Sequence, residues 1–145
     1  MNTFYVLEPE VAGDLGERSI LDYSTQPPTV LKLHYEFNVW LGDDLLTTHP
    51  CFIVTDRLRA ALDKLGGAGY CFDDVEISTT EGFYDVSPRI ELPHFYWMKV
   101  YGVPGVDDTG LTEGASLVVS DRFLNLLRGF VMENCLVRRR PFRTV

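Results

Sequence analysis

Residues 51–67, CFIVTDRLRAALDKLGG, contain the clearest structural pattern in the chain. The first four of these residues are apolar and predict a buried strand. Thr55 or Asp56 then provides an N-cap, and leucines follow at i, i+4 and i+7, which places them on one face of a helix. The glycine pair Gly66-Gly67 predicts the end of that helix. We therefore expect a strand, a capped helix over about 55–65, and an extended chain after it.

A second copy of this pattern lies near the C-terminus. With an offset of 65 residues, Val119-Ser120-Asp121-Arg122 matches Val54-Thr55-Asp56-Arg57. The apolar helical face and the following cysteine repeat as well: Leu58, Leu62 and Leu65 match Phe123, Leu127 and Phe130, and Cys71 matches Cys135 to within one residue. We interpret the copies as a duplicated strand–helix–strand unit. Because two units are fewer than a solenoid needs, we expect one fused core.

The remaining segments complete the predicted architecture. Residues 30–40 alternate between apolar and polar side chains, which is typical of a strand with one buried face. A strand is expected after Pro93, and the Gly-, Asp- and Thr-rich segment 103–116 predicts an exposed loop. The prediction is one α+β domain over 1–145, with a mostly antiparallel sheet and two equivalent short helices, at about 55–65 and 121–131. Residues 138–145 are expected to form a basic C-terminal tail.

Charge is distributed unevenly along the chain. The formal net charge is −8, from 21 acidic and 13 basic residues, and four arginines lie within the last eight residues. Residues 1–137 therefore hold 9 basic and 21 acidic residues, a balance of −12. Such a body repels nucleic acid and anionic membranes and favours basic partners. The sequence shows no secretory signal and no apolar stretch long enough for a membrane helix, so we expect a cytoplasmic protein.

Neither a metal site nor a cofactor site is predicted by the sequence. No glycine-rich phosphate loop opens a helix, and the cysteines and histidines show no metal-ligand spacing; they are Cys51, Cys71, Cys135, His34, His49 and His94. Catalysis by a pair of Cys51 and His49 needs an oriented third group and an oxyanion site, and neither is visible. We expect a protein that is not an enzyme. The alternative of a small enzyme using Cys51 or a histidine stays open here.

Three pairs of adjacent aspartates stand out. They suggest an acidic contact surface for a basic partner, although turn and cap chemistry also explains such pairs locally. Trp40 falls on the polar side of its strand, so we expect it to anchor a partner. The candidate partner-binding residues are Trp40, Asp43, Asp44, Asp73, Asp74, Glu76, Asp107 and Asp108.

The segment 51–77 resembles a motif of immunity proteins encoded beside bacterial polymorphic toxins. The resemblance is carried by the apolar strand ending in Val54-Thr55-Asp56, the short helix, and the closing strand Gly69-Tyr70-Cys71-Phe72; residues 117–137 repeat it. It implies an α+β fold and a protein that binds a cognate toxin domain and blocks its active site. A structural or dimerisation module, including a homodimer, is the other alternative.

Overall fold

A computed structural model describes residues 3–140 of the chain. The helices are α1 (Asp56–Leu65), α2 (Phe83–Val86) and α3 (Asp121–Leu127). The strands are β1 (Phe4–Glu8), β2 (Glu10–Val11), β3 (Gly13–Leu15), β4 (Ile20–Asp22), β5 (Thr29–Lys32), β6 (His34–Phe37), β7 (Leu45–Thr48), β8 (Cys51–Thr55), β9 (Tyr70–Asp73), β10 (Glu76–Thr79), β11 (Phe95–Val100), β12 (Thr109–Leu111), β13 (Leu117–Ser120) and β14 (Leu136–Arg139). The expected α+β class and mostly antiparallel pairing are confirmed, with β6–β10 and β2–β7 as parallel pairs.

The duplicated unit is present in both expected places. Thr55 caps α1 by accepting a hydrogen bond from the Leu58 N–H, and Ser120 caps α3 by accepting one from the Phe123 N–H. Gly66 ends α1 in the left-handed conformation, at φ 62°. The expected length of the second helix is wrong, because α3 ends at Leu127. The next turns tighten to i→i−3 hydrogen bonds as the chain passes Gly129, a poor helix former.

The two units exchange a strand. Their sheets have the orders β7-β8-β11-β9 and β12-β13-β1-β14, the first carrying β2 beyond β7. In each sheet the third strand comes from the other half of the chain. Phe95 of β11 lies opposite Thr55, and Phe4 of β1 lies opposite Ser120, so β1 and β11 occupy equivalent positions. The molecule is therefore an internal duplication with interlocked halves, which the sequence pattern alone did not predict.

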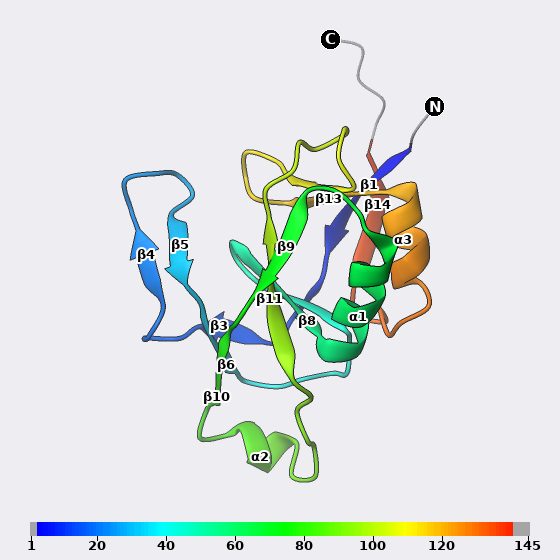
Figure 1. Cartoon of the computed structure of the whole chain (residues 1–145). Helices are drawn as coiled ribbons and strands as arrows, with labels where there is room; N and C mark the ends of the chain where they lie inside the picture. Colours follow the sequence, from blue (N-terminus) through cyan, green and yellow to red (C-terminus); the bar gives the residue numbers. More distant parts are fainter. Residues whose placement is uncertain (1–2, 141–145) are drawn as a thin grey trace.

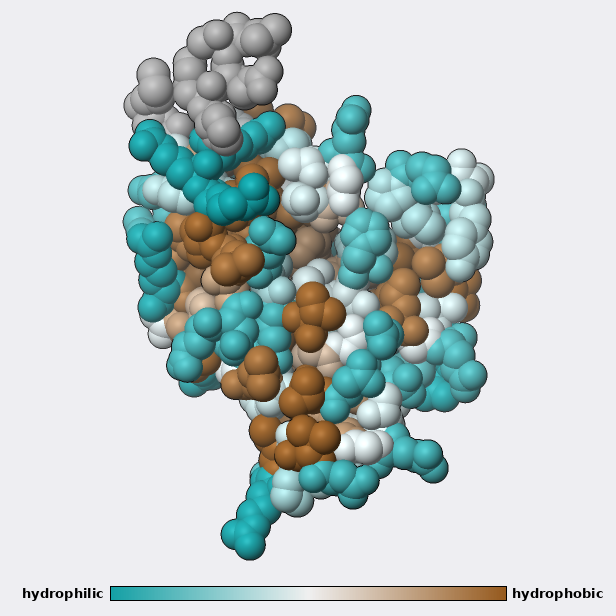
Figure 2. All heavy atoms as spheres, turned by 180° about the vertical axis from the view of Figure 1, so that it is seen from behind, coloured by the Kyte–Doolittle hydropathy of each residue, from teal (hydrophilic) through white to brown (hydrophobic). Residues whose placement is uncertain are grey.

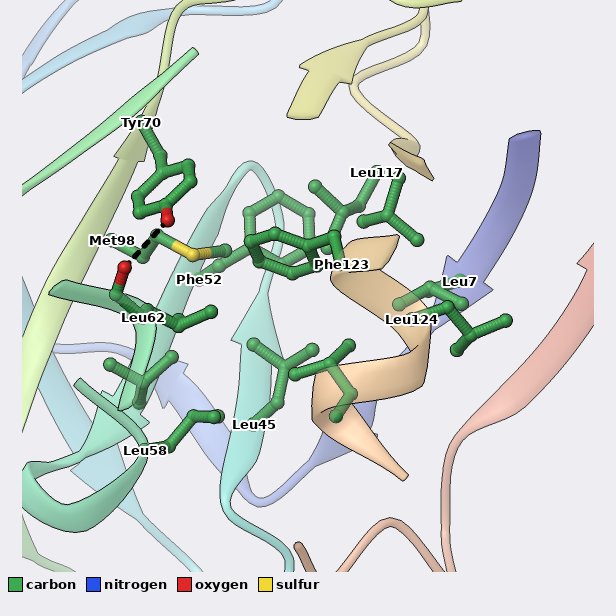
Figure 3. Close-up of a cluster of buried hydrophobic side chains, with 13 residues drawn as sticks. Leu7, Leu45, Phe52, Leu58, Leu62, Tyr70, Met98, Leu117, Phe123 and Leu124 are labelled. Atoms are coloured by element: carbon green, nitrogen blue, oxygen red, sulfur yellow. Dashed lines mark hydrogen bonds between the residues drawn. The ribbon is translucent and has the colours of Figure 1, made fainter. Parts of the chain in front are cut away.

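One hydrophobic core, core 1, is shared by both units. Helices α1 and α3 lie side by side (Figure 1), and their buried faces meet the inner faces of the two sheets. Figure 3 shows the side chains converging from both halves, with the Tyr70 hydroxyl donating to the Leu62 carbonyl at 2.8 Å. Members of core 1 include Leu7, Phe52, Leu58, Leu62, Leu117, Phe123 and Leu127. The expected single fused core is present between the helices.

The first unit has a second core, core 2, on the other face of its sheet. Alternation along β8 points Phe52 and Val54 into core 1, and Cys51 and Ile53 into core 2. The sheet β10-β6-β3 covers this face. Its strands come from segments inserted between β1 and β7 and between β9 and β11. The described chain supplies no equivalent sheet for the second unit, so this elaboration is specific to the first.

The strand expected over 30–40 is interrupted at Leu33. It forms β5, which pairs with β4, and β6, which pairs with β3 and β10. Leu31 is 61% exposed because the β4–β5 hairpin leaves the main sheets. His34, expected on the polar face, is buried, and its ring is satisfied by the Arg18 N–H and the Ser78 hydroxyl. His34 is therefore buried among hydrogen-bonding partners instead of facing solvent.

Two further expectations need correction. The segment 103–116 is not wholly an exposed loop: β12 lies within it, and Asp108, Thr109 and Gly110 are buried. Gly110 is required there, since an added Cβ would lie 2.3 Å from the backbone nitrogen of Pro104. The tail expected over 138–145 begins as part of β14, which pairs with β1 through Arg139. Residues 141–145 lie outside the described part of the chain.

We expect the matched substitutions Leu62→Ala and Leu127→Ala to destabilise the protein by about 2–5 kcal/mol each. Both leucines are fully buried in core 1, at equivalent positions of the two units. Urea unfolding, followed by far-UV circular dichroism and tryptophan fluorescence, measures the change. Because Trp97 lies in core 2, equal midpoint shifts in both signals are expected if the two cores unfold together.

Lys64→Ala, on an exposed position of α1, is the control and should change the stability by less than about 0.5 kcal/mol. A fluorescence midpoint that stays at the wild-type value in Leu62→Ala would contradict a single cooperative unit.

Candidate functional site

The structure divides the candidate partner-binding residues by burial. Asp73 and Asp74 are exposed, and the Glu76 side chain is 31% exposed. Asp43, Asp44 and Asp108 are buried at 0%, 1% and 8% exposure. Asp107 is half-buried and accepts a hydrogen bond from the Val103 N–H at 2.7 Å, which is turn chemistry within its own loop. The buried and the exposed candidates therefore lie in different environments.

Asp44 holds an arginine and a helix cap in place. Its Oδ1 accepts from the Thr55 hydroxyl at 2.6 Å and from Arg57 Nε at 2.7 Å, and its Oδ2 accepts from Arg57 Nη2 at 2.7 Å. The Val131 N–H donates to the same Oδ2 at 2.8 Å. Burial alone raises the pKa of Asp44, but the bonds from Arg57 and Thr55 outweigh it and lower the pKa below its usual value.

Asp108 repeats this arrangement in the second unit. It accepts from the Ser120 hydroxyl at 2.7 Å, and from Arg122 Nε and Nη2 at 2.9 and 2.7 Å. The Ala68 N–H supplies the fourth bond at 2.9 Å. The hydrogen bonds from Arg122 hold the pKa of Asp108 well below its usual value. We call these two networks the Asp–Arg clamps.

The clamps are reciprocal. The loop after α1 donates to Asp108 of the second unit, and the loop after α3 donates to Asp44 of the first. Two backbone hydrogen bonds also link these loops: the Asp44 N–H donates to the Val131 carbonyl, and the Thr109 N–H donates to the Ala68 carbonyl. Each buried carboxylate therefore fastens one unit to the other. Sequence reasoning missed this role, although the matching Asp–Arg positions in both copies were the available signal.

Asp43 also has a structural role. Its carboxylate accepts from the backbone and side-chain amides of Asn134, at 2.8 and 3.0 Å. The nearby Glu10 accepts from the N–H groups of Leu41 and Asp43, at 2.7 and 3.2 Å. Burial raises the pKa of Glu10. These carboxylates join the segment after β1, the loop before β7 and the loop after α3.

The expectation of a contact surface at Asp43, Asp44 and Asp108 is therefore wrong. Their oxygens are buried and already accept hydrogen bonds from this chain. Trp40 is likewise half-buried rather than a projecting anchor: its indole N–H donates to the Asp43 carbonyl at 3.0 Å, and its ring packs against Phe95. The carboxylates that remain available for a contact surface belong to the segment 73–76.

The exposed acidic residues line a groove with a volume of about 350 Å³. Its two sides are residues 31–33, at the end of β5, and residues 73–76, which connect β9 to β10. Trp97, on β11, lines it as well. The volume is at the lower end of the roughly 300–1,000 Å³ typical of ligand sites. Sequence reasoning found Asp73, Asp74 and Glu76 but missed the apolar lining, because β5 and β9 come together only in the tertiary structure.

Part of the negative charge of the groove is balanced within the chain. Glu76 pairs with Arg18 and with Lys32, the latter at 3.3 Å, and the Arg18 bond is the main cause of its lowered pKa. Asp73 lies 3.4 Å from Lys99 Nζ, which also sits 4.8 Å from the Trp97 ring centroid. The N–H of Asp74 donates to the Asp73 carboxylate, which lowers the pKa of Asp73. The accessible negative charge of this rim therefore comes from Asp74 and from Asp73, whose charge Lys99 partly balances.

The cysteine proposed as an alternative nucleophile is poorly suited to that role. Cys51 is 4% exposed, and burial raises the pKa of its thiol to about 12. The thiolate, which is the nucleophilic form, is therefore scarce at neutral pH. Within residues 3–140, no group of three or more His, Cys, Asp or Glu side chains is placed to hold a metal ion. None of the helices described is long and apolar enough to cross a membrane.

Other exposed apolar side chains are scattered. On the face opposite to the view of Figure 1, they appear in several places with hydrophilic side chains between them (Figure 2). The exposed apolar residues of the described chain include Val11, Leu41 and Val106, at 67%, 61% and 72% exposure. The groove combines apolar lining with exposed charge, so it is the best candidate site in the described chain.

Comparison with protein-family models gives no match, and comparison with curated proteins gives none either.

We expect Asp44→Asn and Asp108→Asn to destabilise the protein by about 2–3 kcal/mol each, since each leaves buried donors facing an amide. The cost stays below that of a fully buried ion pair because the Arg57 and Arg122 side chains are 60% and 56% exposed. Urea unfolding measures it, with Asp63→Asn as the control. The Asp63 side chain is 56% exposed, and its loss should matter little. Equal stability of all three variants would contradict the structural role of the clamps.

Stability should fall in acid because of the same two carboxylates. Their folded-state pKa values lie below the ordinary value of 3.8, so their contribution is complete above that pH and is lost as the pH falls through the folded values. Glu10, with a raised pKa, acts in the opposite direction. Urea unfolding from pH 7 to pH 3 should show a decline below about pH 4 that flattens in the Asp44→Asn/Asp108→Asn double variant. A decline of the same slope in both proteins would overturn this assignment.

Proposed function

We propose that this chain is an immunity protein, a stoichiometric inhibitor that binds a basic bacterial toxin domain in the cytoplasm. The single observation that supports it best is the groove between residues 31–33 and 73–76, where exposed carboxylates border an apolar floor. An acidic rim around apolar contacts is suited to a basic protein partner. The resemblance of residues 51–77 to immunity proteins points in the same direction.

The overall charge supports the same kind of partner. With a balance of −12 over residues 1–137, the chain attracts a basic domain over a distance and orients it during the encounter. The clamps neutralise Asp44 and Asp108 with Arg57 and Arg122, so they contribute little to that attraction. The exposed acidic residues, and those of the groove in particular, provide the local field.

A dimerisation module is the second candidate function. Its support is the edge strand β14, which pairs with β1 alone in the described chain and exposes all four of its residues. An uncovered edge can pair with another strand. The arginines at 138 and 139 oppose pairing with an identical strand, because two copies would place like charges together. We therefore favour the toxin-binding role.

The first experiment is capture of partners from a bacterial lysate at low and moderate salt, followed by expression of each retained protein alone. We expect a protein with a basic domain, retained near 1:1, whose expression is toxic and whose toxicity is relieved when this chain is expressed with it. A retained protein that is harmless alone, or toxicity that the chain does not relieve, would contradict the immunity role.

With that partner in hand, Asp73→Asn/Asp74→Asn should slow association about three- to tenfold at low salt and reduce its dependence on salt, because steering scales with charge near the contact. Stopped-flow or surface-plasmon-resonance kinetics measure both. Asp63→Asn/Glu113→Gln removes the same net charge at exposed positions that do not line the groove, and is the matched control. An equal effect of both double variants would remove the groove from the binding site.

A further inference from the structure

The groove lies where two neighbouring segments, residues 31–37 and 73–79, are no longer paired with each other. We call the unpaired part, residues 31–33 and 73–75, the fork. Strands β6 and β10 pair in parallel, with His34 opposite Glu76 and Phe37 opposite Thr79. The pairing begins with the bond from the Glu76 N–H to the Leu33 carbonyl, at 3.0 Å. On the N-terminal side of that bond the two segments separate (Figure 1). The groove is lined by residues of both segments.

The two segments separate because, before the fork, each forms hydrogen bonds with a different strand. Before the fork, β5 pairs with β4, and β9 pairs with β11. Within residues 3–140, neither strand has a second partner, so each keeps one edge without a ladder. An edge of this kind presents backbone N–H and carbonyl groups that can hydrogen-bond an added strand. Strand β5 leads into β6 and β9 leads into β10, and it is these following strands, β6 and β10, that pair in parallel.

We propose that an extended segment of the basic partner enters this fork and pairs as a β-strand along β5 and β9. The inference rests on the proposed function and specifies how the partner binds. The groove is lined on one side by residues 31–33, which begin in β5, and on the other by residues 73–75, which follow from the last residue of β9. Three residues on each side correspond to about 10 Å of extended chain. The inserted contact is therefore short, and the rest of the partner lies outside the groove. The Asp74 N–H already donates to the Asp73 carboxylate, so an added strand uses the other backbone groups.

The lining determines the chemistry of the inserted segment. Successive side chains of a strand point to opposite faces, so one set meets the floor and the other meets the rim. The floor contains Leu33 and Trp97, both buried, which favour an apolar side chain. The rim contains three carboxylates, Asp73, Asp74 and Glu76, and one cation, Lys32, which pairs with Glu76. The exposed Asp73 and Asp74 favour Lys or Arg. The segment that fits is one of alternating apolar and basic residues.

The chain already contains one cation in this environment. Lys99 places its ammonium 3.4 Å from the Asp73 carboxylate and 4.8 Å from the Trp97 ring centroid. A cation over an aromatic face beside a carboxylate is a favourable arrangement. A basic side chain from the partner would lie beside Lys99 and contact the exposed carboxylates of Asp73 and Asp74.

The test uses the full chain and three synthetic peptides, each acetylated and amidated. The first is Val-Arg-Val-Arg-Val, the second is the same peptide N-methylated at alternate residues, and the third is Val-Glu-Val-Glu-Val. We expect the first to bind, the acidic peptide not to bind, and N-methylation to weaken binding about tenfold, because it removes backbone donors. Isothermal titration calorimetry measures the affinities, and hydrogen exchange should show slower exchange at residues 31–33 and 73–75 when the first peptide is bound.

Asp73→Asn/Asp74→Asn should weaken binding of the first peptide about fivefold or more, while Asp63→Asn leaves it unchanged. Equal affinity for the parent and N-methylated peptides, or no binding of the parent peptide at millimolar concentration, would overturn strand insertion. The proposed function is tested separately by relief of toxicity. A toxin that is neutralised without protection of residues 31–33 and 73–75 would leave the immunity role in place and reject the fork as its site.

Discussion

The two buried Asp–Arg clamps fasten the duplicated units to each other. Each carboxylate fixes an arginine, a helix cap and a backbone amide, and the amide comes from the other unit. A buried carboxylate is costly unless all of its acceptor sites are occupied, so the four donors have to arrive together. This requirement aligns α1 with the loop before β12 and α3 with the loop before β7. Core 1 then closes between two helices whose positions are already determined.

The elaboration of the first unit explains why the two halves differ in surface chemistry. Insertions around β6 and β10 bury the outer face of the first sheet, and they create the fork where β5 and β9 separate. The second unit keeps the plain arrangement. Equivalent positions also carry opposite charge: Asp73 pairs with Lys99 where Arg138 pairs with Glu8. The groove therefore lies in the first unit, where these additional segments are present.

The sequence predicted the local elements well and their long-range partners poorly. The caps at Thr55 and Ser120, the apolar face of α1 and the duplicated unit follow from residues close together in the chain, so their signal is local. Strand exchange was not predictable in this way, since pairing of Phe4 with Ser120 leaves no periodic trace. The acid pairs were recognised as unusual, but burial depends on which loops meet them. For this reason Asp43, Asp44 and Asp108 were wrongly assigned to the surface. In the structure Asp73, Asp74 and Glu76 line the groove, and their role in binding a partner remains a prediction.

The exchanged strands also affect how the chain can be made. The sheet of the first unit lacks β11 until synthesis has passed Val100, and β1 has no neighbour until β13 and β14 emerge near the end. Neither unit can complete its sheet until a strand from the other half of the chain is present. The apolar strands of the first half therefore stay exposed during synthesis. The same topology makes the protein a natural candidate for fragment complementation: a cut between β10 and β11 would give two polypeptides that each hold a strand the other needs.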